Sequence, residues 1–172
     1  GFPGPVLGGR PMAEPRNLGR GWVGFDFARS FGCPVKLVND AAMQALGSYQ
    51  GGKMLFLGLG TGLGTALIVE GIVAPMEVSH LPYKKATYES YVGKAGLERA
   101  GKKKWRRHVA DVVECLIAAL QPDVLVLDLN MDGPPAVATL AAVRELCPRT
   151  RVLILTAYDD DDDLLDDEPI DW

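Results

Sequence analysis

The sequence predicts an α/β protein, because short apolar runs of strand length alternate with stretches of helical periodicity. The most regular helical pattern covers residues 102–120, where apolar side chains recur three and four positions apart before Pro122. Hydrophobic residues make up 48% of the 172 residues, which is enough for a sizeable core. Five apolar runs have the length of buried strands, namely residues 35–38, 54–59, 65–69, 124–127 and 152–155.

The stretches between these runs are expected to hold shorter helices, turns and loops. Residues 1–24 are rich in Gly, Pro and Arg and are predicted to form loops, and residues 75–101 are predicted to be mixed and rich in loops. The runs 54–59 and 65–69 flank a tight glycine turn, which predicts a β-hairpin. Further helices are predicted for residues 25–31, 41–46 and 136–146.

Charge is distributed unevenly along the chain. The formal net charge is −4, but residues 159–172 hold nine acidic residues and no Lys or Arg. The preceding 158 residues therefore hold 18 basic and 13 acidic side chains. The tail is too densely charged to pack against a core, and we predict that residues 159–172 are disordered.

The composition argues against several classes of protein. No apolar run approaches the ~20 residues that span a bilayer, so no membrane partner is expected. The three cysteines are far apart in sequence, which argues against a disulfide framework and fits a reducing cytoplasm. No helix-turn-helix pattern is present, so no nucleic-acid partner is expected. Because the first residue is Gly1 rather than Met, we expect that an N-terminal part precedes this sequence.

The first candidate site is the glycine-rich segment at residues 58–65, Gly-Leu-Gly-Thr-Gly-Leu-Gly-Thr. Glycines let backbone N–H groups approach phosphate oxygens, and a threonine hydroxyl adds a further donor. The spacing matches neither the dinucleotide-binding fingerprint nor a P-loop. The segment therefore predicts a phosphate-binding turn between two strands, and the alternative is a glycine-rich hairpin that binds no ligand.

The second candidate is the pair Asn39-Asp40, which precedes a predicted helix. A carboxylate in this position can accept a proton from a sugar hydroxyl that attacks a phosphoryl group, and the amide can hold a neighbouring hydroxyl. The alternative is structural, because Asn and Asp are favoured helix N-caps.

A third candidate comprises Glu77, His80 and Glu89, whose side chains can hydrogen-bond a polyhydroxylated ligand. A lone histidine more often has a structural role, so the pattern is weak when taken alone. It does not predict a zinc site, because one His without nearby cysteines cannot supply the usual three or four ligands.

These segments, in this order, resemble motifs of the ROK family (repressor, open reading frame, kinase) over roughly residues 1–122. Residues 1–6 resemble the family's Gly-x-Pro-Gly loop beside the sugar, and Asn17-Leu18 with Trp22 resembles its Asn-Leu…Trp segment. Residues 38–47 resemble the sugar-binding and catalytic-base motif, and residues 57–65 resemble the second phosphate motif. Residues 77–80 resemble the motif Glu-x-Gly-His, with serine in place of glycine.

The resemblance implies a role for each matching residue. Asp40 is implied as the general base toward the sugar 6-hydroxyl. The implied sugar ligands are Asn39, Glu77, His80 and Glu89, with Pro3 and Gly4 in the loop beside the sugar. The residues implied to lie near the transferred phosphate are Gly60, Thr61 and Gly62.

The segments look similar to the polyphosphate/ATP glucokinases, and this resemblance implies Mg²⁺ as cofactor and polyphosphate or ATP as phosphoryl donor. The cysteine-rich zinc motif of many family members is replaced here by residues 81–89, so no zinc is expected. The basic cluster from Lys102 to Arg107 then predicts a track for a polyanionic donor, and the alternative is a solvated helix face. The family's first phosphate motif and its late Gly-Gly-Gly-Asn motif are absent.

The segment at about residues 121–158 resembles a fragment of a response-regulator receiver domain instead. Asp128 corresponds to the phosphoacceptor at the end of a strand, and Thr156 to the switch hydroxyl of the next strand. The receiver's leading acidic pair and its lysine-bearing strand are missing, and the loop after Met131 is shortened.

Together these features predict a partial actin-like ATPase (ribonuclease H-like) fold with a receiver-like βαβ fragment at the C-terminus. The predicted divisions are residues 1–122, 123–158 and 159–172, and the strands of the second division are expected to complete the sheet of the first. The predicted parent activity is phosphoryl transfer from polyphosphate or ATP to the 6-hydroxyl of glucose, in the cytoplasm, by a homodimer. Whether this chain is itself an enzyme stays open. The alternatives are a phosphoacceptor signalling module and a non-functional fusion.

Overall fold

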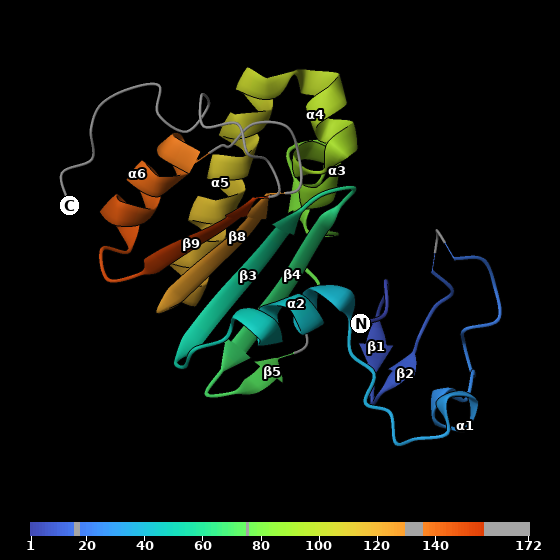
Figure 1. Cartoon of the computed structure of the whole chain (residues 1–172). Helices are drawn as coiled ribbons and strands as arrows, with labels where there is room; N and C mark the ends of the chain where they lie inside the picture. Colours follow the sequence, from blue (N-terminus) through green and yellow to red (C-terminus); the bar gives the residue numbers. More distant parts are fainter. Residues whose placement is uncertain (16–17, 75, 130–135, 157–172) are drawn as a thin grey trace.

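A five-stranded mixed β-sheet forms the centre of the molecule (Figure 1). The structure is a computed structural model that describes residues 1–15, 18–74, 76–129 and 136–156. The strand order is β5-β4-β3-β8-β9. The bounds of these strands are Lys53–Leu59 for β3, Leu63–Val69 for β4, Ile72–Ala74 for β5, Val124–Leu129 for β8 and Arg151–Thr156 for β9.

The sheet combines an antiparallel meander with two parallel strands. β3 pairs antiparallel with β4 across the glycine turn, and β4 pairs antiparallel with β5. β8 runs parallel to β3, and β9 runs parallel to β8. Parallel neighbours require crossover connections, which are helical here. This arrangement agrees with the predicted ribonuclease H-like half of an actin-like ATPase.

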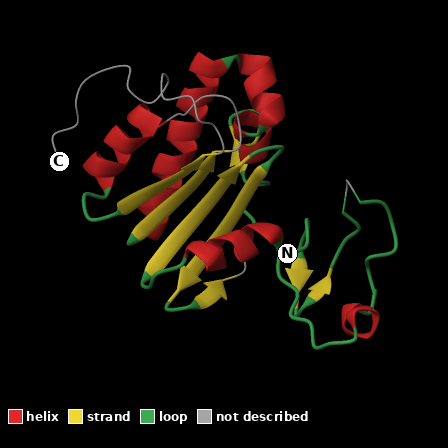
Figure 2. Ribbon diagram, viewed as in Figure 1, coloured by secondary structure: helices red, strands yellow, loops and turns green. Residues whose placement is uncertain are grey.

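Helices cover both faces of the sheet (Figure 2). The connection from β5 to β8 holds three consecutive helices, and the connection from β8 to β9 holds α6. One further helix, α2, lies on the opposite face from α5 and α6. The bounds are Asp40–Ser48 for α2, Tyr88–Val92 for α3, Lys94–Ala100 for α4, Lys102–Leu120 for α5 and Ala136–Leu146 for α6.

The larger core lies between the sheet and α5. Alternate residues of β3 and β8 point toward α5, as the period of two in a strand requires, and Leu57 and Leu127 are fully buried there. Trp105 in the first turns of α5 is 1% exposed, and its Nε1 donates a 2.8 Å hydrogen bond to the Val92 carbonyl. This bond ties α5 to the end of α3.

The N-terminal 38 residues form a separate segment beside the start of α2 (Figure 1). It contains the two-residue strands β1, Val6–Leu7, and β2, Arg10–Pro11, and the short helix α1, Phe27–Phe31. Trp22 contacts three phenylalanine rings, those of Phe2, Phe25 and Phe27. α1 has no buried residue, so this segment packs much less tightly than the sheet.

Most predicted elements are confirmed, including the α/β class, the hairpin at 54–59 and 65–69, and the helix at 102–120. The strands expected to complete the sheet do so as β8 and β9. Their receiver origin and the three domain divisions stay predictions, and residues 159–172 lie outside the described residues. No helix of the described residues is long and apolar enough to cross a membrane.

Two predictions of local structure were wrong. Residues 35–38 are not a strand, because no strand within the described ranges pairs with them, and the bridge beside them joins Phe2 to Asn39. Residues 75–101 are less loop-rich than predicted, because they contain α3, α4 and a small hairpin. The hairpin comprises β6, Pro82–Tyr83, and β7, Ala86–Thr87.

Candidate functional site

Asp40 occupies the first position of α2, directly after the N-cap Asn39. The Asn39 Oδ1 atom accepts hydrogen bonds from the N–H groups of Ala41, at 2.9 Å, and Ala42, at 3.4 Å. Asn39 therefore performs the capping role that sequence reasoning offered as an alternative for the pair. Asp40 is exposed, so its carboxylate can meet a ligand from solvent.

The loop at residues 1–4 is held beside Asp40 by three backbone-directed hydrogen bonds. The Asn39 Nδ2 atom donates to the Gly4 carbonyl at 3.1 Å, and the Asp40 N–H donates to the Phe2 carbonyl at 3.0 Å. The Phe2 N–H donates in turn to the Val38 carbonyl at 2.9 Å. Pro3 and Gly4 are thus brought to Asn39 and Asp40, and their place beside a sugar stays a prediction.

The start of α2 also lies against the strand that follows the glycine turn. A Cβ atom at Gly64 would lie 3.1 Å from the Ala41 Cβ, so only glycine lets the helix approach β4 this closely. Gly64 is two residues beyond Gly62, at the beginning of β4. This contact places the N-terminal end of α2, and with it Asp40, near the glycine turn.

The glycine turn itself spans Gly60, Thr61 and Gly62. The Gly60 N–H donates to the Gly62 carbonyl at 3.1 Å, and the Gly60 carbonyl accepts from the Lys94 N–H at 3.0 Å. Among the hydrogen bonds of the described residues, none uses the N–H groups of Thr61 or Gly62. These two groups are available to an anion, whereas the Gly60 N–H is occupied within the turn.

Glu89 lies on the other side of this turn, in the first turn of α3. A Cβ atom at Gly62 would lie 2.5 Å from Glu89 Oε2, so the Glu89 carboxylate rests directly against this position of the turn. The Glu89 N–H donates to the Ser79 carbonyl at 3.0 Å. Ser79 is 3% exposed, and its hydroxyl donates a short hydrogen bond to the Glu77 carboxylate. A continuous chain of contacts therefore links Gly62, Glu89, Ser79 and Glu77.

The predicted site residues thus form two groups around the glycine turn. Pro3, Gly4, Asn39 and Asp40 approach it from the α2 side. Glu77 and Glu89 approach it from the α3 side. His80 is exposed, and no described hydrogen bond joins it to either group. Its role as a sugar ligand stays a prediction.

Sequence reasoning missed two structural residues of this site. Ser79 connects the two glutamates, although the sequence showed it only as a replacement for a glycine. Gly93 packs against the turn, because a Cβ atom there would lie 2.9 Å from the Thr61 carbonyl oxygen. The Gly93 contact has no local sequence signal, because Thr61 is distant in the chain, and the bond between Ser79 and Glu89 depends on where α3 packs.

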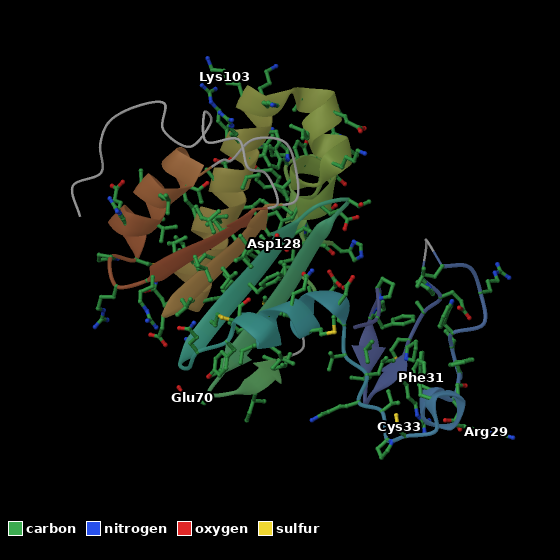
Figure 3. All side chains as sticks on the ribbon, viewed as in Figure 1. Arg29, Phe31, Cys33, Glu70, Lys103 and Asp128 are labelled. Atoms are coloured by element: carbon green, nitrogen blue, oxygen red, sulfur yellow. The ribbon has the colours of Figure 1, made fainter. Side chains whose placement is uncertain are left out.

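Asp128 lies on β8, two strands away from β4, near the same end of the strands as the glycine turn. It pairs in register with Gly58 of β3 and Leu155 of β9. Asp128 is labelled in Figure 3. It shares the α2 side of the sheet with Val126, two residues earlier. Partial burial raises the pKa of the Asp128 carboxyl above its ordinary value. Its role as a phosphoacceptor stays a prediction, and the Thr156 side chain and Met131 lie outside the described residues.

The described residues contain no group of three or more His, Cys, Asp or Glu side chains placed to hold a metal ion. Magnesium usually keeps several waters and binds proteins through one or two carboxylates together with substrate phosphates. The residues therefore fit Mg²⁺ only as an ion that arrives with the phosphoryl donor. Asp40 and Glu89 are the carboxylates beside the turn.

Comparison with known proteins rests on structure, because neither a family model nor a curated protein matches the sequence. The inorganic polyphosphate/ATP-glucomannokinase of Arthrobacter sp. strain KM is 22% identical with a TM-score of 0.63, over 90% of this chain and 64% of that chain. A ROK family protein of Streptococcus pneumoniae, in complex with sucrose, is 16% identical with a TM-score of 0.67, over 90% and 73% of the two chains. The fold is that of the ROK sugar kinases.

A third similar structure shows the ligands of one such kinase. The ROK family glucokinase of Streptomyces griseus, in complex with glucose and AMPPNP, is 13% identical with a TM-score of 0.54, over 74% of this chain and 65% of that chain. This chain therefore spans less than two thirds of the length of the glucomannokinase and of the glucokinase. The shared fold agrees with the order of motifs in the sequence.

Proposed function

We propose that this chain carries the catalytic-base and phosphate-turn half of a ROK-type sugar kinase. The proposed reaction is phosphoryl transfer from polyphosphate or ATP to the 6-hydroxyl of glucose. The observation that carries the proposal is the contact between Ala41 and Gly64, which sets the exposed Asp40 carboxylate beside the Gly60–Gly62 turn. A general base and a phosphate-binding turn are the two parts that such a transfer needs in close proximity.

Asp40 supplies the proton acceptor in this scheme. As the sugar 6-oxygen forms its bond to the terminal phosphorus, its O–H bond breaks and the proton passes to the Asp40 carboxylate. The bond between that phosphorus and the bridging oxygen of the donor breaks, and the shortened donor leaves with the electron pair. Asn39 provides the helix N-cap. The Asp40 Oδ1 atom also accepts a hydrogen bond from the Ala41 N–H at 2.9 Å, so Oδ2 is the oxygen that remains available for this step.

The glycine turn stabilises the charge of the transferred group. The N–H groups of Thr61 and Gly62 can donate to phosphoryl oxygens without rearrangement of the turn. The turn is held in place by the hydrogen bond from the Lys94 N–H to the Gly60 carbonyl and by the packing of Gly93 against Thr61. Mg²⁺, when bound with the donor, supplies further neutralisation of phosphate charge.

Glu77 and Glu89 orient the sugar in the same scheme. Ionised carboxylates accept hydrogen bonds from hydroxyl groups. The buried Ser79 holds the Glu77 carboxylate through its hydroxyl and the Glu89 backbone through its carbonyl oxygen. Asn39 contributes less to sugar binding than the resemblance implies. Its Oδ1 caps α2 and one N–H of Nδ2 binds Gly4, which leaves a single N–H for a ligand. The predicted homodimer and the cytoplasmic location stay predictions.

The test is an assay of glucose-6-phosphate formation by the purified chain, with polyphosphate and ATP as separate donors. Asp40→Asn is expected to lower turnover by about 10²- to 10⁴-fold, because general-base catalysis contributes that much. Glu145→Gln, at an exposed position of α6, is the matched control and should leave turnover unchanged. Circular dichroism establishes that each variant is folded. A folded parent chain without turnover from either donor would remove the claim that this chain is a kinase.

A further inference from the structure

A cluster of aromatic and ionisable side chains lies outside the candidate site, where the β6–β7 hairpin packs against α5. Its centre is the half-buried His108 of α5. The His108 ring makes edge-to-face contacts with Tyr83 of β6, at 5.8 Å between centroids, and with Tyr91 of α3, at 4.9 Å. Figure 1 shows α3 and α4 beside α5. His108 therefore contacts both the hairpin and the helix that carries Glu89.

The hairpin and the start of α3 form one closed unit. The Tyr88 N–H donates to the Leu81 carbonyl at 3.0 Å, which closes the base of the hairpin. The next N–H, that of Glu89, donates to the Ser79 carbonyl at 3.0 Å. The Glu89 carboxylate in turn rests against Gly62. A shift of the hairpin on α5 would therefore move Glu89 relative to the glycine turn.

Two groups approach the same nitrogen of His108. The Tyr83 hydroxyl lies 3.0 Å from Nδ1, and the Lys84 Nζ atom lies 3.1 Å from it. The Tyr83 hydroxyl donates its one proton to Asp111 Oδ2 at 2.5 Å, so toward His108 it can only accept, whereas the lysine ammonium can only donate. A neutral His108 with a bare Nδ1 therefore accepts from Lys84. A protonated His108 would instead donate to Tyr83 and face the charge of Lys84.

The surroundings of His108 favour its neutral form. Burial and the Lys84 charge lower the pKa of His108 below its ordinary 6.5, Asp111 acts in the opposite direction, and Arg99 lowers it further. The stabilisation from a neutral His108 is present above pH 6.5 and is lost as the pH falls through that value toward the lowered pKa. The ionisable neighbours come from each element packed around the ring, namely Tyr83 and Lys84 of the hairpin, Tyr91 of α3, Arg99 of α4, and Lys104 and Asp111 one turn away on α5.

The ion pair between Lys84 and Asp111 does not hold the hairpin by itself. Its atoms are 3.6 Å apart, and the two side chains are 46% and 49% exposed. Exposed pairs of this kind contribute little, because solvent screens them. The contact of Lys84 with His108 is therefore the part of the cluster that a change of pH can break.

We propose that His108 is a positioning residue, whose neutral form holds the β6–β7 hairpin on α5 and thereby keeps Glu89 against the glycine turn. Protonation breaks the contact with Lys84 and lets the hairpin move away from α5. The docking of the hairpin follows from the described contacts alone. The effect on sugar binding rests on the proposed function.

The first experiment measures docking by hydrogen exchange and mass spectrometry of the full chain, on peptides covering residues 81–92. After correction for intrinsic exchange, protection is expected to fall about threefold from about pH 7.5 to about pH 5.5, the size expected for loss of one hydrogen bond. The decrease should disappear in His108→Gln, whose amide does not titrate, and persist in His80→Gln, at the other histidine of the chain. Circular dichroism verifies that each variant is folded.

A pair of lysine variants tests the contact at about pH 7.5. Lys84→Gln should lower protection of the same peptides about threefold, because it removes the donor to His108. Lys85→Gln, at the exposed neighbouring position of the same turn, is the matched control and should leave protection unchanged.

Three results would overturn the proposal. They are equal protection of the parent chain at the two pH values, a decrease that persists in His108→Gln, and equal effects of the two lysine variants.

The positioning role is measured separately in the glucose-6-phosphate assay. Over the same pH range the KM for glucose is expected to rise about threefold more in the parent chain than in His108→Gln, with kcat changing equally in both. The same pH profile of the glucose KM in both chains would overturn the positioning role. Docking that depends on His108 in a chain that never phosphorylates glucose would overturn the proposed function but support the role of His108 in holding the hairpin.

Discussion

The helices on the two faces of the central sheet bury different kinds of side chain. The face covered by α5 buries large residues, including Trp105, Leu57 and Leu127. The helix on the other face, α2, buries only three alanines, which approach larger sheet residues such as Met54, Phe56 and Ile68, with Gly64 opposite Ala41. Large side chains provide most of the apolar burial, whereas small ones allow backbones to approach each other closely. The first face therefore supports the fold and the second positions Asp40.

The largest effect on stability is expected on the α5 face, from Trp105→Ala. Removing a buried indole leaves a cavity and an unpaired Val92 carbonyl, which should lower the free energy of unfolding by about 3–5 kcal/mol. Urea denaturation followed by circular dichroism measures this loss. Phe31→Ala, at a side chain that is 68% exposed, is the control and should cost little. A loss below about 1 kcal/mol for Trp105→Ala, the size of an ordinary single substitution, would contradict this account of the core.

The largest effect on catalysis is expected on the α2 face, from Gly64→Val. A Cβ at this position already meets the Ala41 Cβ at 3.1 Å, so valine should push the start of α2 away from β4. A displacement of about 1 Å at a reacting group can reduce turnover about 100-fold. The glucose-6-phosphate assay measures this loss. The proposed difference between the two faces is wrong if Gly64→Val lowers the free energy of unfolding as much as Trp105→Ala does, while turnover by the folded protein is unchanged.

A smaller effect on sugar binding is expected from Ser79→Ala. The variant removes the donor that holds the Glu77 carboxylate, and loss of one hydrogen bond to a charged group costs about 1.5–3 kcal/mol. We expect the KM for glucose to rise at least about tenfold, with a smaller change in kcat. Ser48→Ala is a matched control, because its hydroxyl binds the Gln44 carbonyl at an exposed site. Equal glucose KM values in the two variants would show that Ser79 does not position Glu77.

The parts of the fold that were predictable from sequence are those with local signals. The helix at 102–120 was predicted to the residue, because its period and the following Pro122 are local signals. The segment at 35–38 has the composition of a strand, but a strand needs a neighbour, and none pairs with it. The short helices α3 and α4 were missed because each has too few residues to show a period.

The candidate site was predictable only in part for a related reason. Asp40 and the glycine turn belong to contiguous motifs, so the sequence located both. The approach of Glu89 to Gly62 joins residues 27 positions apart, and the link through Ser79 depends on where α3 packs. Such contacts are set by tertiary packing, which leaves no pattern in a single sequence.

The smallest expected effect concerns Asp128, the ionisable group of β8 on the α2 side. Partial burial raises the pKa of its carboxyl above the ordinary 3.8, so the folded protein holds this proton more tightly than the unfolded chain does. The resulting stabilisation is fully present below pH 3.8 and is lost as the pH rises through the raised value.

Asp128→Asn removes this titration and the ionised carboxylate with it. The melting temperature of the variant should therefore exceed that of the parent at pH 7, and the difference should shrink toward pH 3. Thermal unfolding between these pH values measures it, with Glu145→Gln as an exposed control. A destabilised variant at pH 7 would mean that the Asp128 carboxylate has a favourable ionic partner. A phosphoacceptor must be ionised before it attacks phosphorus, and burial of the Asp128 charge opposes this ionisation. A destabilised variant would therefore also favour the receiver-like role of Asp128.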